Sequence, residues 1–314
     1  MREERGGAGK GPRQKGEGGG AGQGRGRNGF GGPARGPAAG PERSRGYGGG
    51  PAGREARDGG DAVRTGPPED LIYGRNPVLE ALRKGRPITR VWLAKESKDR
   101  VGAEAAALCH QANIPFKYVD RPFLDHLCWN GLHQGLAAQA APKEYVEWES
   151  MLELAKAKGQ QPLLVILDEV EDPHNLGAIL RSADALGAHG VVIPKRRAVP
   201  LTAGVSRASA GALEYVAVAR VTNLNQTIEK MKEAGLWVMG ASASARDAIY
   251  DVDWTGPVAL VLGGEDKGIS RLVEENCDAL VRIPMEGNVN SLNVSASGAI
   301  ILSEIKRQRL NAAK

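Results

Sequence analysis

The chain has 314 residues, which is long enough for about two domains, and 25% of them are charged. The net charge of +5 is unevenly distributed. Residues 1–68 carry 13 Lys and Arg against 7 Asp and Glu, a net of +6, whereas the remainder carries 29 against 30, or −1. Because the remainder has no net positive charge, it must bind any polyanion through local basic patches.

Residues 1–68 form a tail with 24 of the 43 glycines, 7 of the 18 prolines and almost no aliphatic residues. Such a segment buries too little apolar surface to offset the entropy of ordering, so we expect it to be disordered. Its GRGR and RSRGY stretches, at 24–27 and 43–47, are similar to Arg/Gly-rich tails that hold RNA loosely. A solubilising extension with no specific role is the alternative.

The sequence contains no run of 18 apolar residues, and its N-terminus lacks the apolar core of a signal peptide. Glu3, Glu4 and Glu17 disfavour an organelle transit peptide, because such segments are poor in acidic residues. We therefore expect a cytoplasmic protein. The three cysteines show no CxxC spacing, which suits a reducing compartment: Cys109, Cys128 and Cys277.

Residues 69–141 are expected to form a small α/β domain. A turn at 71–77 leads into a short helix with Val78, Leu79 and Leu82 on one face. A strand at 91–94, a helix at 100–112 and a strand around Phe116 follow. The polar residues 142–160 are expected to connect this domain to the next.

Residues 161–314 are expected to form a second domain. Its first strand, 163–167, is apolar throughout, as is typical of a strand covered on both faces. Helix and strand signals then alternate, which predicts an α/β fold with a parallel sheet. The expected helices cover 176–186, 201–209, 224–234 and 295–309, and the expected strands cover 191–193, 215–218, 236–239, 258–262 and 280–283.

Three segments of the second domain have an unusual composition near expected strand ends, where ligands usually bind in open α/β sheets. The first, 172–187, reads DPHNLGAILRSADALG. Asn175 is expected to cap the helix unless it binds a ligand, and His174 is expected to be a loop residue before it. Arg181 lies in an otherwise Ala- and Leu-rich helix, where a cation is expected to need a carboxylate, phosphate or ribose partner.

The second segment, 262–269, reads LGGEDKGI, and the third, 283–297, reads IPMEGNVNSLNVSAS. The second matches neither a Walker A loop nor GxGxxG, which disfavours both nucleotide chemistries, and its glycines alone indicate only a turn. The third holds more Asn and Ser side chains than helix capping uses, so a polar ligand-binding loop explains it better. These side chains are Asn288, Asn290, Ser291, Asn293, Ser295 and Ser297.

Together, NLGAILRSADALG, LVLGGEDKGI and IPMEGNVNSLNVSAS resemble motifs one, two and three of the SpoU (TrmH-like) RNA 2'-O-ribose methyltransferases of the SPOUT superfamily, in order and at family-like spacing. The resemblance covers about 162–309. Local matches at 73–78, 133–135 and 210–214 resemble the RlmB-like subgroup, which methylates a guanosine ribose in large-subunit (23S) ribosomal RNA.

The resemblance implies an α/β domain with a C-terminal trefoil knot, S-adenosylmethionine as cofactor, no metal, and a homodimer whose active site borders the subunit interface. By position, the cofactor contacts fall on Gly263, Ile283 and Leu292, mainly through backbone groups. The catalytic positions are Arg181, Asn175, Glu265, Ser291 and Asn293. Because arginine is a poor general base, Arg181 is expected to orient the ribose or phosphate and to stabilise developing alkoxide charge.

Residues 69–141 lack a catalytic constellation and are expected to bind the RNA substrate. His133 and Gln134 are further expected RNA contacts. Five basic residues are expected either to meet phosphates or to form a solvated basic face: Arg75, Arg83, Lys84, Arg86 and Arg90.

Three alternatives remain open. Transfer RNA is the alternative substrate, because the same three motifs serve both reactions. A non-catalytic RNA-binding or ribosome-assembly factor would keep the fold, although the presence of Arg181 and Asn293 favours an enzyme. A zinc site is disfavoured because the spacing of its candidate ligands fits no standard arrangement: Cys109, His110, His126 and Cys128.

Overall fold

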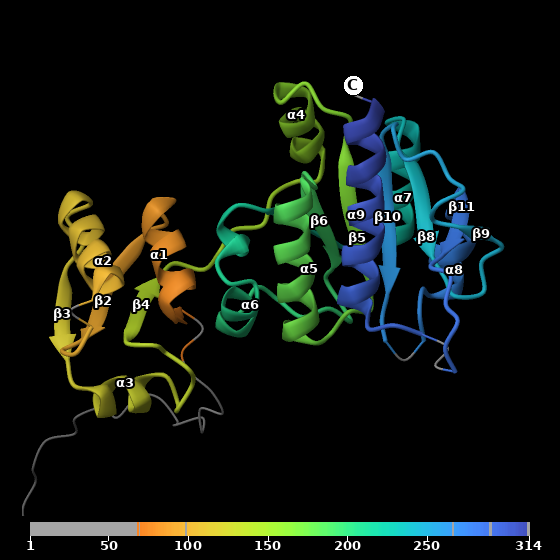
Figure 1. Cartoon of the computed structure of the whole chain (residues 1–314). Helices are drawn as coiled ribbons and strands as arrows, with labels where there is room; N and C mark the ends of the chain where they lie inside the picture. Colours follow the sequence, from red (N-terminus) through yellow and green to blue (C-terminus); the bar gives the residue numbers. More distant parts are fainter. Residues whose placement is uncertain (1–67, 69, 98, 266, 289–290, 313–314) are drawn as a thin grey trace, which may run out of the picture. The chain divides into compact units, whose positions relative to one another are not determined.

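The computed structural model describes residues 68, 70–97, 99–265, 267–288 and 291–312 (Figure 1). The tail expected at 1–68 lies outside the described residues, except for Pro68. Within the described ranges, no helix has the length and apolar character needed to cross a membrane.

The first part of the described chain contains a four-stranded sheet in the order β1-β4-β2-β3. The pair β2 and β3 is parallel and the other pairs are antiparallel. The expected helices and strands near 78–82, 91–94, 100–112 and 116 are present, whereas β1, β4 and α3 were not expected. The elements are β1 (Leu71–Tyr73), α1 (Arg75–Arg83), β2 (Ile88–Ala94), α2 (Arg100–Gln111), β3 (Phe116–Val119), α3 (Arg121–Leu127) and β4 (Leu136–Ala140).

The two faces of this sheet pack against different helices. Side chains alternate along β2, so Val91 and Leu93 join an apolar cluster with residues of α1 and α2. On the opposite face, Trp92 packs with Leu124 of α3. The seven-residue α3 is much shorter than the 12-residue α2, so the two faces are covered by helices of unequal length.

The larger sheet has seven strands in the order β7-β6-β5-β10-β8-β11-β9, and every pairing is parallel. The predicted α/β fold with a parallel sheet is therefore confirmed. Its inner strand β5 is buried at all six positions, as its uninterrupted apolar sequence indicated. The strands are β5 (Leu163–Asp168), β6 (Gly190–Pro194), β7 (Ala217–Val221), β8 (Trp237–Ala241), β9 (Asp247–Ala248), β10 (Val258–Gly263) and β11 (Ala279–Arg282).

Helices cover both faces of the larger sheet. Helices α5 and α9 lie side by side on one face, where they share a core with β5 and β10 (Figure 1). Side chains of α4, α7 and α8 join the core on the other face. The helices are α4 (Glu149–Ala157), α5 (Pro173–Leu186), α6 (Ala203–Ala208), the 3-10 turn η1 (Ala212–Glu214), α7 (Leu224–Glu233), α8 (Arg271–Glu275) and α9 (Val294–Ala312).

The segment 142–160, expected to be a polar connector, contains α4. Met151 of α4 is fully buried, and Trp148 just before the helix is 6% exposed. A Cβ atom at Gly190 of β6 would lie 2.2 Å from the Met151 sulfur, so this helix packs closely over the sheet. Few large apolar side chains make this packing, mainly Trp148 and Met151 with the partly buried Leu152, too few for the sequence pattern to predict the helix.

Four of the five basic residues expected to meet phosphates have partners within the described chain. Arg86 is the most buried of them: its Nη1 lies 2.7 Å from Glu214 Oε1, and the carboxylate is 1% exposed. The Lys84 ammonium lies 4.3 Å from the Tyr215 ring centroid. Arg75 pairs with Asp99, and Arg83 pairs with Glu80 and Glu104. The expectation of a basic RNA-binding face is therefore wrong for Arg86, which is buried in an ion pair.

His133 and Gln134 are also used inside the small domain. The His133 ring is 6% exposed, accepts a hydrogen bond from the Gly135 N–H and lies 2.9 Å from Asp125 Oδ1. The Gln134 side-chain oxygen accepts a hydrogen bond from the Arg75 N–H. His133 is therefore a structural residue and not a free RNA contact.

Candidate active site

A pocket lies at the carboxyl ends of the parallel strands β8, β10 and β11. Because parallel strands end at the same edge of a sheet, the segments that follow these three strands come together there. The pocket has a volume of about 470 Å³. It is lined by residues of 241–244, 262–269 and 281–292 and by the first turns of α9.

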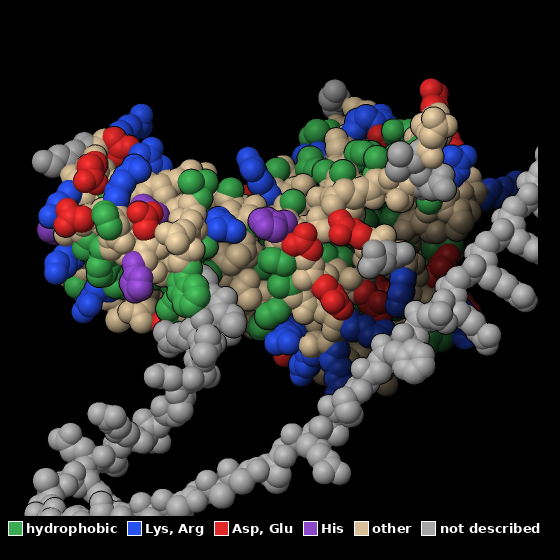
Figure 2. Space-filling model, turned by 90° about the horizontal axis from the view of Figure 1, so that it is seen from below, with side chains coloured by type: hydrophobic (Ala, Val, Ile, Leu, Met, Phe, Trp, Pro, Cys, Tyr) green, Lys and Arg blue, Asp and Glu red, His purple; other side chains and the backbone are tan. Residues whose placement is uncertain are grey.

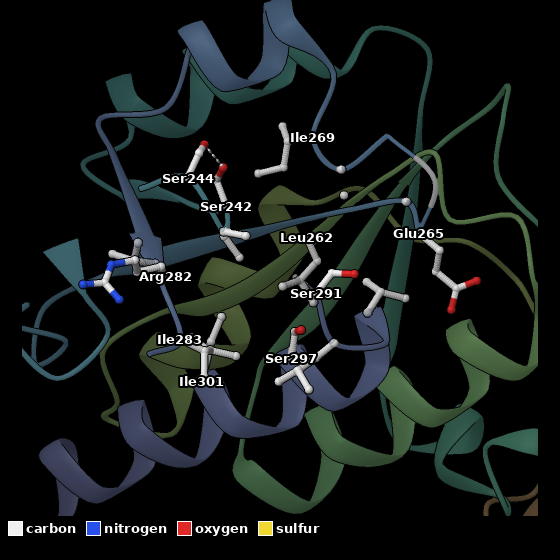
Figure 3. A pocket seen from close by; sticks show the side chains of 18 of the residues that line it. Ser242, Ser244, Leu262, Glu265, Ile269, Arg282, Ile283, Ser291, Ser297 and Ile301 are labelled. Carbon is white, nitrogen blue, oxygen red and sulfur yellow. Dashed lines mark hydrogen bonds between the residues drawn. The ribbon is translucent and has the colours of Figure 1, made fainter. Parts of the chain in front are cut away.

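The three expected cofactor contacts, Gly263, Ile283 and Leu292, all line this pocket. Figure 3 shows the neighbouring Ser242 and Ser244 at one end of the pocket and Glu265 at the other. Apolar side chains complete the walls: Leu262, Ile269, Met285, Val294 and Ile301. The volume is in the range of about 300–1,000 Å³ that is usual for small-molecule sites, and apolar walls beside backbone and hydroxyl groups suit a nucleoside with a polar tail.

Gly263 is required by a close backbone approach. A Cβ atom there would lie 2.0 Å from the Gly268 carbonyl carbon and 2.1 Å from the Ile269 nitrogen. Gly268 has a positive φ of 67°, and its N–H donates to the Gly264 carbonyl, closing the turn. The buried Asp168 at the end of β5 accepts from the Ser270 N–H at 2.7 Å, which fixes the exit of this turn against the sheet.

Three of the expected catalytic residues meet directly. Asn175 Nδ2 donates to Glu265 Oε1 at 2.7 Å, and Asn293 Nδ2 donates to the same oxygen at 2.5 Å. The two asparagines are also joined, because Asn293 Nδ2 lies 3.0 Å from Asn175 Oδ1. The Glu265 carboxylate, in 262–269, thus accepts from one side-chain amide in each of the other two segments, Asn175 in 172–187 and Asn293 in 283–297.

Asn175 does not cap its helix, contrary to expectation. Helix α5 begins three residues earlier than predicted, at Pro173, and Asp172 caps it by accepting from the His174 N–H. Proline is favoured at the first helical position, which explains the earlier start. Asn175 is therefore in the first turn of the helix, and its buried side chain is free to bind Glu265.

Asn293 combines two tasks. Its Oδ1 accepts from the Ser295 and Ala296 N–H groups and from the Ser295 hydroxyl, so it caps α9. Because Oδ1 is held by these donors, Nδ2 is directed to Asn175 and Glu265. Both ends of the amide are thus used, and its orientation is fixed by hydrogen bonding.

Arg181 and Ser291 are not part of this network. Ser291 lines the pocket with an exposed side chain. Arg181 is exposed on α5, about 9 Å along the helix from Asn175, and makes no hydrogen bond or ion pair with the rest of the described chain. Position 181 faces away from the core, so no carboxylate of the described chain is its partner, and a phosphate or ribose partner stays a prediction.

Residues 241–244 also line the pocket, although their sequence does not predict a ligand site. Ala241 is the last residue of β8 and the other three follow it, and the hydroxyls of Ser242 and Ser244 lie 2.9 Å apart. The one sequence signal for them is their place after an apolar strand, which they share with the loops at 262–269 and 283–297. Their sequence ASAS lacks the glycines or concentrated amides that marked those loops.

The candidate zinc ligands do not converge. Cys109 packs with Val91 on one face of the small sheet, whereas Cys128 packs with Trp92 on the other. Burial raises the pKa of Cys109 to about 11, which keeps it a thiol at neutral pH. Within the described part of the chain, no three His, Cys, Asp or Glu side chains are grouped to hold a metal.

Comparisons with known proteins agree with this site. Residues 162–303 match the SpoU rRNA Methylase family, and residues 71–146 match the RNA 2'-O ribose methyltransferase substrate binding family. The putative TrmH family tRNA/rRNA methyltransferase YacO of Bacillus subtilis is 47% identical over 240 residues, which cover 76% of this chain and 96% of that protein. The chain belongs to the SpoU, or TrmH, family of methyltransferases.

Other family members and solved structures agree. An uncharacterized tRNA/rRNA methyltransferase of Mycolicibacterium gilvum is 42% identical, with 85% of this chain and 86% of that protein covered. The SpoU methyltransferase AviRb from Streptomyces viridochromogenes has a TM-score of 0.63 and 26% identity, with 77% of this chain and 90% of that chain covered. A second AviRb structure contains S-adenosylmethionine, which is the cofactor of the family. The pocket at 263, 283 and 292 suits it in size and lining.

An exchange of amide and carboxylate between Asn293 and Glu265 tests the network. Asn293→Asp keeps the cap of α9 but places a second carboxylate against Glu265, so we expect the free energy of unfolding to fall by about 1–3 kcal/mol. Glu265→Gln in the same chain restores a donor facing a carboxylate and should recover at least half of the loss. Chemical denaturation of the wild type, the two single variants and the double variant measures the coupling energy between the two positions. Purely additive changes in the free energy of unfolding would contradict direct contact.

The turn at Gly263 gives a second prediction. Gly263→Ala forces a Cβ into the 268–269 backbone, so we expect at least a tenfold loss of S-adenosylmethionine affinity by titration calorimetry. Gly256→Ala is the matched control, because a Cβ there meets nothing within 4 Å. Equal affinity of both variants, with the fold checked by circular dichroism, would show that the close approach does not shape the pocket.

Proposed function

We propose that the protein transfers a methyl group from S-adenosylmethionine to the ribose 2'-hydroxyl of a guanosine in large-subunit (23S) ribosomal RNA. The observation that supports this reaction is the contact of Asn175, Glu265 and Asn293 at the edge of the cofactor pocket. Glu265 belongs to both features, since it lines the pocket and accepts from both asparagines.

Bound S-adenosylmethionine supplies an electrophilic methyl group, so the protein has to position the ribose and manage charge. Glu265 and the two asparagines fix the polar rim on which the ribose would rest. Arg181, which is exposed, has five N–H donors available for an RNA phosphate or for the oxygen that develops negative charge. The hydroxyl proton would pass to water late in the reaction, because a guanidinium does not accept protons near neutral pH.

The small domain supports ribosomal RNA as substrate. It matches the substrate-binding family of RNA 2'-O-ribose methyltransferases over 71–146, and the catalytic domain matches a family described by rRNA methylation. The relatives' names include both tRNA and rRNA, so transfer RNA is the second candidate substrate. The proposal also includes a homodimer, because the resemblance implies an active site that borders a subunit interface.

Transfer of labelled methyl from S-adenosylmethionine to unmodified ribosomal RNA and to transfer RNA tests the proposal. We expect one large-subunit guanosine to become resistant to alkali. Labelling of transfer RNA alone would keep the reaction and overturn the substrate. Cofactor binding without labelling of either RNA would instead support the non-catalytic RNA-binding factor.

Replacement of Arg181 by lysine tests its proposed role. Lysine keeps the charge but loses the planar donor fork, so we expect turnover at saturating RNA to fall at least tenfold while S-adenosylmethionine affinity is unchanged. Arg271→Lys, at a side chain that is 82% exposed on α8, is the matched control. Near-normal turnover of the Arg181→Lys enzyme would refute the role.

A further inference from the structure

The small domain has a groove of about 640 Å³ along its edge strand β3 and the neighbouring strand β2. Strand β3 is at the edge of the four-stranded sheet and pairs only with β2 among the described strands. Aromatic and basic side chains alternate around the groove. It is lined by Arg90, Trp92, Lys95, Pro115, Phe116, Lys117, Tyr118, Val119, Asp120 and Phe123.

The groove arises because the short helix α3 covers only part of its sheet face. Trp92 and Lys117 are opposite each other in the β2–β3 pairing, so both point to the α3 side of the sheet. Phe123 of α3 lies beside Trp92, with ring centroids 6.5 Å apart. Trp92 is almost completely covered, but Phe123 is 47% exposed. Tyr118 follows Lys117 in β3 and points to the opposite face of the sheet, where its ring centroid lies 5.9 Å from that of Phe116.

The charges of the groove are mostly uncompensated. Arg90 and Lys117 are exposed and form no ion pair with any described carboxylate. Lys95 pairs with Asp120 at 2.9 Å, but both side chains are more than half exposed, so this pair is weak. Three cations against one carboxylate give the groove a net charge of +2.

This local charge contrasts with its surroundings. Residues 69–314 carry a net charge of −1, and Figure 2 shows acidic and basic side chains interspersed over the face that it views. A groove with a net positive charge and an exposed ring, Phe123, is therefore a distinct feature of the folded part. Cations that follow a backbone beside rings that stack on bases are the two components of single-strand nucleic-acid binding.

We propose that this groove binds a single-stranded segment of the RNA substrate, with Arg90 and Lys117 at phosphates and with Phe123 stacked on a base. The inference rests on the proposed function, which supplies RNA as the ligand. The chain's own tail is a poor occupant, because residues 1–68 carry a net charge of +6 and would be repelled by the groove.

The groove shares no residue with the cofactor pocket. Changes in it therefore act on RNA affinity and on the Michaelis constant for RNA, not on turnover at saturating RNA. This separates the groove from Arg181 and from the asparagine network, whose changes act on turnover.

The test uses the full chain and a fluorescein-labelled 20-nucleotide oligouridylate, which has no stable secondary structure. We expect Arg90→Glu with Lys117→Glu to weaken binding at least tenfold in fluorescence anisotropy. The slope of log affinity against log salt should fall by about 1.4, or about 0.7 for each lost phosphate contact on a single strand. Arg100→Glu with Lys156→Glu makes the same change of charge at exposed sites on α2 and α4 and should keep the wild-type slope.

Phe123→Ala tests stacking separately. It should weaken binding about tenfold without changing the salt slope, because it removes a stacking surface and no charge. An unchanged circular-dichroism spectrum and melting temperature in each variant show that the fold is intact.

Wild-type affinity and slope in the Arg90→Glu, Lys117→Glu protein would overturn the groove assignment, even if the wild type methylates RNA. Equal losses in the control pair would also overturn it, because the effect would then come from net charge. Displacement of the oligouridylate by poly-glutamate at equal charge concentration would assign the groove to an acidic protein instead. Absence of methyl transfer by the wild type would count against the proposed function and not against the groove.

Discussion

One carboxylate holds together the polar edge of the candidate active site. Glu265 accepts hydrogen bonds from Asn175 and Asn293, two residues separated by 118 positions in the chain. The first anchors the beginning of α5, and the second caps α9, so the same three side chains fix the relation of two helices to the turn after β10. A charged acceptor makes these bonds stronger than bonds between neutral groups, and leaving either amide without its partner is costly.

The parallel sheet makes this contact possible. Strands β5, β8, β10 and β11 all end at one edge, so loops far apart in sequence meet there. The absence of a side chain at Gly263 lets the turn close on itself, and Asp168 ties the exit of the turn to β5. The result is a site in which the pocket and the polar network share Glu265, as methyl transfer from a bound cofactor to an oriented hydroxyl requires.

The folded part has no net positive charge, so a polyanion would have to bind it at a local basic patch. Most basic side chains of the small domain near its α1 helix are paired with carboxylates or covered by a ring, which leaves them little free charge for phosphates. The cations along β2 and β3 differ because the short α3 leaves their sheet face partly open. An RNA bound there would contact both charge and the exposed Phe123 ring, while Arg181 is a separate exposed cation on α5.

The sequence by itself determined the class of the fold and the three segments of the site. The apolar run at 163–167 and the alternation after it specify a parallel sheet, and the grouping of Asn175, Glu265 and Asn293 in recognisable motifs identifies the family. Tertiary structure alone decided that Asn175 binds Glu265 instead of capping its helix, that Arg181 is solvated and that Arg86 is buried against Glu214. It also decided that Trp92, Lys117 and Phe123 enclose one groove. The reason is physical: local propensity follows from neighbours along the chain, whereas these contacts depend on strand order and on which face of a helix or sheet is left uncovered.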